Sequence, residues 1–232
     1  MYKTVEGRWG TVKFFSKDEY VGRALYNYGE YGPDETEKII ALADGLCLDI
    51  GANIGCISQA LVMSGFDVIA FEPQPEVYTL LAENADCISY NVALGAEAGT
   101  AMMPRVHYSE KNNIGGLGLG MQSIYGQYPV AVRTLDSYIF DNVGFIKIDV
   151  EGYELEVLKG AVETIARCRP ILYIEDDRVD KSRELREFIV SLDYTIEEHQ
   201  PTLYRENNFF GLKKNVWDKN YASHNLICMP CF

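Results

Sequence analysis

The sequence predicts an α/β fold of the doubly wound type, in which helices cover both faces of a mostly parallel sheet. From Leu46 onward, short apolar runs alternate with segments of helical periodicity, which is the pattern of repeated β-α units. The chain has 232 residues, 47% of them hydrophobic, so it is long enough to bury a core as one domain. These two observations exclude a disordered or fibrous protein.

Seven strands are expected, and the last two form an antiparallel pair. In chain order they are Leu46–Ile50, Asp67–Glu72, Ile88–Leu94, Phe145–Asp149, Ile171–Glu175, Tyr194–His199 and His224–Met229. Apolar residues at helical spacing predict four helices between them, at Ile54–Met63, Pro75–Asn84, Tyr153–Cys168 and Ser182–Leu192. The predicted sheet is therefore mostly parallel, with an antiparallel last strand.

Three segments do not follow this alternation. Residues 1–33 indicate a short β-hairpin with an aromatic tail that covers one end of the sheet. Residues 99–136 contain the Gly-rich run Asn112–Gly120 between two segments suited to pair as a hairpin, and residues 201–222 form an aromatic-rich insertion. Because long loops are usually functional or disordered, we expect both insertions on the substrate side of a single domain spanning residues 1–232.

Charge and cysteine content narrow the class of protein. The formal net charge is −13 and no Lys/Arg-rich run occurs, which argues against nucleic acid and anionic membranes as partners. The N-terminus has no apolar leader, and no uncharged run is long enough to span a bilayer, so a cytoplasmic location is expected. Six cysteines are too few for a disulfide scaffold, and the pair Cys228 and Cys231 lacks the further ligands of a zinc site.

The most informative motif is the loop Asp49–Gly55, which joins the first predicted strand to its helix. Glycine allows a sharp turn and the close approach of a ligand at the strand ends. The spacing is not the G-x-G-x-x-G of nicotinamide-binding folds, and the acidic Asp49 suits an ammonium or hydroxyl group instead. The alternative is a tight strand-to-helix turn that binds nothing.

A second acidic residue, Glu72, ends the next predicted strand in the run Phe71-Glu72-Pro73. A carboxylate at this position can accept hydrogen bonds from both hydroxyls of a ribose. Taken alone, Glu72 is only a strand-end carboxylate. Together with the Asp49 loop it predicts an adenosyl ligand.

A third acidic run follows the fourth predicted strand, where ligands of open α/β sheets bind. Carboxylates at Asp149, Glu151 and Glu154 crowd this one strand-to-helix turn. The alternative interpretation is structural: Asp149 caps the helix, and the helix dipole favours the other two. Capping and catalysis are compatible.

These runs resemble the FkbM family of methyltransferases. The resemblance extends over Tyr31–Glu175 and rests on residues 47–55, 71–73, 91–95, 134–136 and 146–154. It implies a Rossmann-like class I methyltransferase fold that binds S-adenosylmethionine and, in most members, O-methylates a hydroxyl of a sugar or natural product. The implied acceptor is a small molecule such as a glycoside or another hydroxylated metabolite.

The resemblance also implies roles for individual residues. The methionine part of S-adenosylmethionine would be lined by Asp49, Gly51, Asn53 and Gly55, while Glu72 would hold the ribose and Asn91 would lie near the adenine. The chain ends match the family less well, so the acceptor is not identified.

Catalysis is predicted at Asp149, Glu151 and His224, with a divalent cation beside them. Asp149, Glu175 and Asp176 follow two strand ends and offer the oxygen ligands that Mg²⁺ prefers. A cation there would lower the pKa of the acceptor hydroxyl, leaving Glu151 or His224 to take the proton. In the alternative, Asp149 caps a helix, Asp176 lies in a solvated turn, and a protein base acts alone.

Two other functions stay open at this point. A nicotinamide-dependent oxidoreductase is disfavoured because the third-glycine spacing is missing. A non-catalytic module that binds an adenosyl ligand and partners another protein has the same sequence signals as an enzyme.

Overall fold

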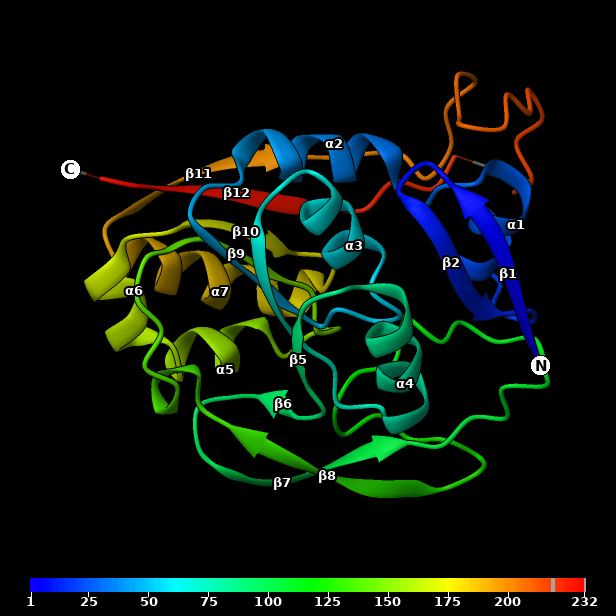
Figure 1. The fold of residues 1–232 in the computed structure, drawn as a ribbon. Helices are drawn as coiled ribbons and strands as arrows, with labels where there is room; N and C mark the ends of the chain where they lie inside the picture. The colour runs from blue at the N-terminus through cyan, green and yellow to red at the C-terminus, as the bar shows by residue number, and fades with distance from the viewer. Residues whose placement is uncertain (218–219, 232) are drawn as a thin grey trace.

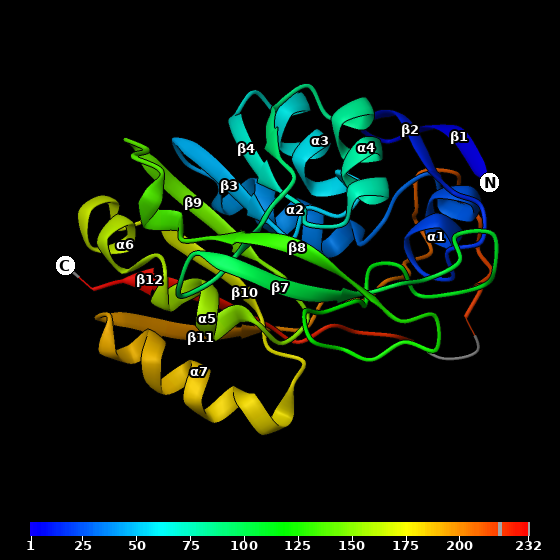
Figure 2. The ribbon, with the colours of Figure 1, turned by 90° about the horizontal axis from the view of Figure 1, so that it is seen from below.

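The computed structural model describes residues 1–217 and 220–231, and a seven-stranded sheet separates two layers of helices in it (Figures 1 and 2). The strand order is β11-β12-β10-β9-β3-β4-β5, and β12 runs antiparallel to the other six strands. The strands are β3 (Leu46–Ile50), β4 (Asp67–Phe71), β5 (Ile88–Tyr90), β9 (Val143–Ile148), β10 (Ile171–Glu175), β11 (Tyr194–His199) and β12 (Asn225–Pro230). The predicted doubly wound fold and its antiparallel last strand are confirmed.

Each face of the sheet packs against its own set of helices (Figure 2). One face carries α2 (Pro33–Leu42), α3 (Cys56–Met63) and α4 (Pro75–Asn84), and the other carries α5 (Glu154–Lys159), α6 (Val162–Cys168) and α7 (Val179–Ser191). Side chains alternate between the two faces along a strand. Cys47, Phe145 and Tyr173 pack with the residues of α2 and α3. Two positions further along the same strands, Asp49, Lys147 and Glu175 therefore face that side as well.

Two predicted elements are divided in the structure. The helix expected at Tyr153–Cys168 is interrupted between α5 and α6, because Gly160 packs against the backbone of Gly95, where a Cβ atom would overlap the carbonyl oxygen. The strand expected at Ile88–Leu94 splits into β5 and β6 (Ala93–Leu94), and β6 leaves the main sheet to pair with β8.

Two smaller sheets flank the main one. The predicted N-terminal hairpin is present as β1 (Tyr2–Gly7) and β2 (Gly10–Phe15), which pack on α4 and on a helix that the sequence did not predict, α1 (Val21–Tyr28). The segments around the Gly-rich run pair antiparallel as β7 (Gly99–Pro104) and β8 (Gln127–Arg133), and the turn η1 (Leu135–Ser137) follows them.

The insertion predicted at 201–222 includes residues 218 and 219, which lie outside the described residues, as does residue 232 at the end of the predicted domain. In the part of the chain that the structure describes, every helix is too short or too polar to cross a membrane.

Candidate active site

A cavity of about 470 Å³ opens at the carboxyl ends of β3, β4, β9 and β10. Its size lies within the roughly 300–1,000 Å³ of small-molecule sites, and ligands of open α/β sheets bind at these strand ends. The sheet side of its wall includes Gly51, Asn53, Glu72, Gln74, Val92, Lys147, Asp149, Glu151 and Glu175. Lining residues from other parts of the chain include Tyr20, Tyr31, Glu35, Asn113, Gly115, Leu117, Leu203, Tyr221 and Ser223.

The backbone N–H groups of the loop after β3 are all hydrogen-bonded within the protein. All five N–H groups of residues 51–55 have acceptors nearby: the Phe71 carbonyl for Gly51 and Ala52, the Glu72 carboxylate for Asn53, the Asn53 side chain for Ile54, and the Ala52 carbonyl for Gly55. A dinucleotide-binding loop instead offers free N–H groups to a pyrophosphate. The hydrogen bonds therefore argue against the nicotinamide interpretation.

The two glycines of this loop have different surroundings. Gly51 lines the cavity with a φ of +78°, and a Cβ atom there would overlap the carbonyl oxygen of Asp149. Gly55, with a φ of +89°, precedes α3 and packs against Leu81 of α4, away from the cavity wall. Gly51 is therefore required where two loops meet, whereas the predicted contact of Gly55 with a ligand is replaced by a contact between helices.

Asp49 lies behind the wall of the cavity and not on it. Its side chain is 0% exposed, accepts a hydrogen bond from the Ser58 hydroxyl of α3 at 2.6 Å, and has the Lys147 ammonium 3.4 Å from its other oxygen. Asp49 was predicted to line the methionine part, but it does not reach the cavity wall, because its side chain is held between Ser58 of α3 and Lys147.

Lys147 joins three parts of the site, a role that the sequence analysis missed. Its side chain is 5% exposed, and its Nζ lies 3.4 Å from Asp49, 3.3 Å from Asp149 and 3.2 Å from the carbonyl oxygen of Gly51. Burial alone would lower the pKa of Lys147, but the two carboxylates raise it well above its ordinary value. A lysine inside an otherwise apolar strand was the available signal.

Glu72, which the sequence analysis predicted to hold a ribose, follows the end of β4 as expected. It is buried at the end of β4, on the cavity wall, and accepts hydrogen bonds from the N–H groups of Asn53 at 3.0 Å and Gln74 at 2.8 Å. Burial raises the pKa of Glu72 to about 7, although the two backbone bonds oppose the shift. Asn91 is off the wall and donates to the Glu72 carbonyl at 2.8 Å, while Val92 lines the cavity beside it.

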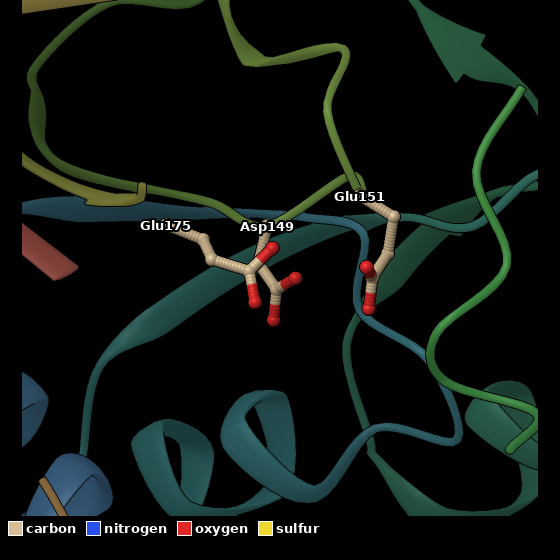
Figure 3. Close-up of side chains that lie close together, drawn as sticks. All are labelled: Asp149, Glu151 and Glu175. Atoms are coloured by element: carbon tan, nitrogen blue, oxygen red, sulfur yellow. The ribbon is translucent and has the colours of Figure 1, made fainter. Parts of the chain in front are cut away.

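Asp149, Glu151 and Glu175 lie close together, and we call them the carboxylate cluster. Each offers an oxygen within 4.8 Å of the others, and Glu151 reaches toward the other two from the loop after β9 (Figure 3). Asp149 pairs with Lys147, and Glu151 pairs with Arg178. Burial, followed by the neighbouring Asp149 and Glu151, raises the pKa of Glu175 to about 11, and burial and Asp149 also raise the pKa of Glu151 to about 8, so these carboxyl groups do not ionise independently.

Two predicted site residues lie elsewhere. Asp176 was predicted beside Glu175, but consecutive residues of an extended chain point to opposite sides, and Asp176 binds Ser182 and Arg186 of α7, each at 2.8 Å. His224 is exposed and off the cavity wall, and its backbone N–H donates to the Asp177 carboxylate at 2.6 Å. Glu151, and not Asp176, completes the carboxylate cluster. His224 does not line the cavity, so it is not placed to act as the predicted base.

Glu35 is a site residue that the sequence analysis did not single out. It lies in the first turn of α2, lines the cavity, and has its pKa raised to about 7 by burial and by the charge of Asp149. Residues 1–33 were interpreted as a cover, and no helix was expected directly after them. The Pro at the first position of α2 with acidic residues behind it was the available signal.

Comparison with known proteins agrees with this geometry. A family model described as "Methyltransferase FkbM domain" matches residues 49–211, more than half of the chain. The hexuronic acid methyltransferase AglP of Haloferax volcanii is 28% identical over 131 residues, which cover 53% of this chain and 52% of that protein.

Two solved structures share the fold. The methyltransferase FkbM from Methylobacillus flagellatus superposes with a TM-score of 0.54 at 20% identity, over 90% of this chain and 55% of that one. The tRNA (uracil-54, C5)-methyltransferase of Pyrococcus abyssi, solved with S-adenosyl-L-homocysteine, gives 0.53 at 11% identity, over 98% and 44%. The chain thus spans about half the length of these relatives. Since the family match includes the loops that build the cavity, the chain belongs to the FkbM family of methyltransferases.

Proposed function

We propose that this chain transfers a methyl group from S-adenosylmethionine to a hydroxyl group of a sugar or another hydroxylated small molecule. The observation that carries the proposal is Glu72, a buried carboxylate on the cavity wall beside a loop with no free backbone donors. Such a site suits an adenosyl group that has a ribose and no pyrophosphate. The relative solved with S-adenosyl-L-homocysteine has the same fold.

The proposed ligand runs along the sheet side of the cavity. Glu72 would hold the ribose, Val92 and Gln74 would contact the adenine, and Gly51 and Asn53 would contact the methionine part. When bound, S-adenosylmethionine supplies a methyl group on a positively charged sulfur. The chain's own residues orient the acceptor and take its proton.

The acceptor is proposed to bind between the carboxylate cluster and the two insertions, residues 99–136 and 201–222. Tyr20, Tyr221 and Leu203 line that part of the cavity, and Asn113 and Gly115 of the Gly-rich run lie on the same wall. Aromatic rings with polar edges suit the faces and hydroxyls of a sugar ring. The name of the relative, a hexuronic acid methyltransferase, supports a sugar acceptor. We propose that both insertions cover the acceptor as parts of one domain.

Calorimetry with the purified chain is expected to show one site for S-adenosylmethionine or S-adenosylhomocysteine. Glu72→Ala would remove the two proposed hydrogen bonds from the ribose hydroxyls to this carboxylate, each contributing about 1.5–3 kcal/mol, so affinity should fall by about 100-fold or more. Glu76→Ala is the control, because Glu76 is exposed one turn along the chain and off the cavity wall. Binding of NAD with no binding of either adenosyl compound would contradict the proposal.

Transfer of a labelled methyl group tests the activity itself. We expect label to appear on members of a panel of glycosides that includes uronic acid glycosides, with an alkali-stable ether product that distinguishes a methylated hydroxyl from a methyl ester. A chain that binds the donor but labels neither the panel nor a cell extract would be the non-catalytic adenosyl-binding module.

The same assay tests the predicted Mg²⁺. Two of the three carboxylates already pair with cationic side chains, Lys147 and Arg178, which takes the place of the charge that a metal ion would supply. Methyl transfer is expected to persist in EDTA. Loss of transfer on chelation, with recovery on adding Mg²⁺ or Mn²⁺, would instead place a cation at Asp149, Glu151 and Glu175.

A further inference from the structure

Six carboxyl groups line the cavity, and four of them are already engaged. Glu72 accepts two backbone hydrogen bonds, Asp149 pairs with Lys147, Glu151 pairs with Arg178, and Asp177 accepts the N–H of His224. The carboxyl groups of the other two, Glu35 and Glu175, have neither a hydrogen-bond nor an ion-pair partner within the described residues 1–217 and 220–231. These two are therefore the groups with capacity left for a substrate.

The two unpartnered groups differ in access and in protonation. One oxygen of Glu175 is buried, and burial together with the neighbouring Asp149 and Glu151 raises the pKa of that side chain, which favours its protonated form. Glu35 lies in the first turn of α2, on the cavity wall and on the face of the sheet where Lys147 and Asp149 also lie. Of the two unpartnered groups, Glu35 is therefore the one suited to take a proton from a molecule in the cavity.

We propose that Glu35 is the general base that takes the proton of the acceptor hydroxyl. The inference rests on the proposed function and adds a catalytic residue to it. As the acceptor oxygen attacks the methyl carbon, its O–H bond breaks and the proton passes to a carboxylate oxygen of Glu35. A new C–O bond forms, and the electron pair of the broken C–S bond stays on sulfur, which becomes a neutral thioether.

The charges around Glu35 fit this role. Asp149, Asp49 and Asp177, from the ends of three neighbouring strands, raise its pKa together with burial, and Lys147 lowers it. Two tyrosines, Tyr31 and Tyr173, also face it; burial raises their pKa values above the ordinary value, at which a tyrosine is already uncharged at neutral pH. The resulting value of about 7 is close to the operating pH, where a general base is most effective.

The test is Glu35→Gln in the full chain, compared with Glu37→Gln. Glu37 lies on the same helix but is exposed and pairs with Arg205, outside the cavity. For Glu35→Gln we expect unchanged affinity for S-adenosylmethionine by calorimetry, an unchanged acceptor KM, and a kcat lower by about 10²- to 10⁴-fold, the usual contribution of a general base. Glu37→Gln should match the wild type in all three.

The pH profile separates a base from a structural residue. A base works when deprotonated, so wild-type kcat/KM for the acceptor should rise with pH through about 7 and then level off, measured at saturating S-adenosylmethionine so that titration of Glu72 in the donor site does not contribute. Glu35→Gln should lack this rise, and Glu35→Asp, which keeps a carboxylate, should retain it at reduced rate. A wild-type kcat or an unchanged rise in Glu35→Gln would overturn the proposal, as would loss of donor binding alone. Failure of the wild type to bind the donor would instead refute the proposed function.

Discussion

Replacing Lys147 with Met is expected to lower the free energy of unfolding by about 3–5 kcal/mol, the usual cost of removing one partner of a buried ion pair. The Met side chain has a similar volume, so the loss comes from charge and not from a cavity. Asp49, 0% exposed, would keep the Ser58 hydrogen bond but lose its only ion-pair partner in the described residues. Urea unfolding monitored by fluorescence and circular dichroism measures the change.

A double-mutant cycle identifies the cause. Asp49→Asn still accepts the Ser58 hydrogen bond and removes the buried charge, so Asp49→Asn/Lys147→Met should be more stable than Lys147→Met alone. The same substitution at Lys159, which pairs with Glu156 near the surface, should cost less than about 1 kcal/mol. Equal costs at Lys147 and Lys159 would show that the buried ion pairs do not stabilise the fold.

Gly51→Ala is the second change for which we expect a large effect. The residue has a φ of +78°, and an added Cβ would overlap the carbonyl oxygen of Asp149, a backbone atom that no rotamer change can move. The loops after β3 and β9 would have to separate, which would also displace Lys147 from the Gly51 carbonyl. We expect a loss of stability beyond about 4 kcal/mol, in the range reserved for severe disruptions, together with loss of donor binding.

Gly65→Ala is a matched control for this change. Gly65 has a φ of +92°, so alanine meets a comparable backbone penalty, but nothing lies within 4 Å of the added Cβ. A left-handed conformation alone costs about 1–2 kcal/mol. The difference between the two variants in urea unfolding therefore reports the overlap with Asp149. If both cost the same, contact between the two loops would not explain the glycine at position 51.

The strand ends divide the proposed chemistry between two regions of the cavity. Glu72, at the end of β4, accepts hydrogen bonds from two backbone N–H groups, which leaves its carboxylate suited to neutral hydroxyls. After β9, Asp149 pairs with Lys147 and Glu151 pairs with Arg178, and the unpaired carboxyl group of Glu35 lines the same cavity. The first region suits the ribose of the donor, and the second suits an acceptor hydroxyl that must lose a proton.

Much of the fold follows from local patterns. The strands β3, β10 and β11 and the helix α4 begin and end where the sequence predicts. The strands β3 and β10 are short, mostly apolar runs, and α4 has apolar residues at helical spacing after a Pro at its first position. The errors occur where distant contacts intervene. Gly160 interrupts a helical pattern because Gly95 packs against it, and β6 leaves the strand it continues because β8 offers a partner.

The candidate site was predictable in position but not in the pairing of its charges. The sequence by itself determined the doubly wound fold, the loops at the strand ends and the acidic residue at the ribose position, since these depend on periodicity and on short runs of neighbouring residues. Only the tertiary structure decided that Lys147 pairs with the buried Asp49, that Asp176 faces α7, and that a helix outside the predicted motifs brings Glu35 to the cavity. These outcomes depend on which helix covers each face of the sheet and on contacts such as that between Lys147 and Gly51, 96 residues apart, which no local pattern contains.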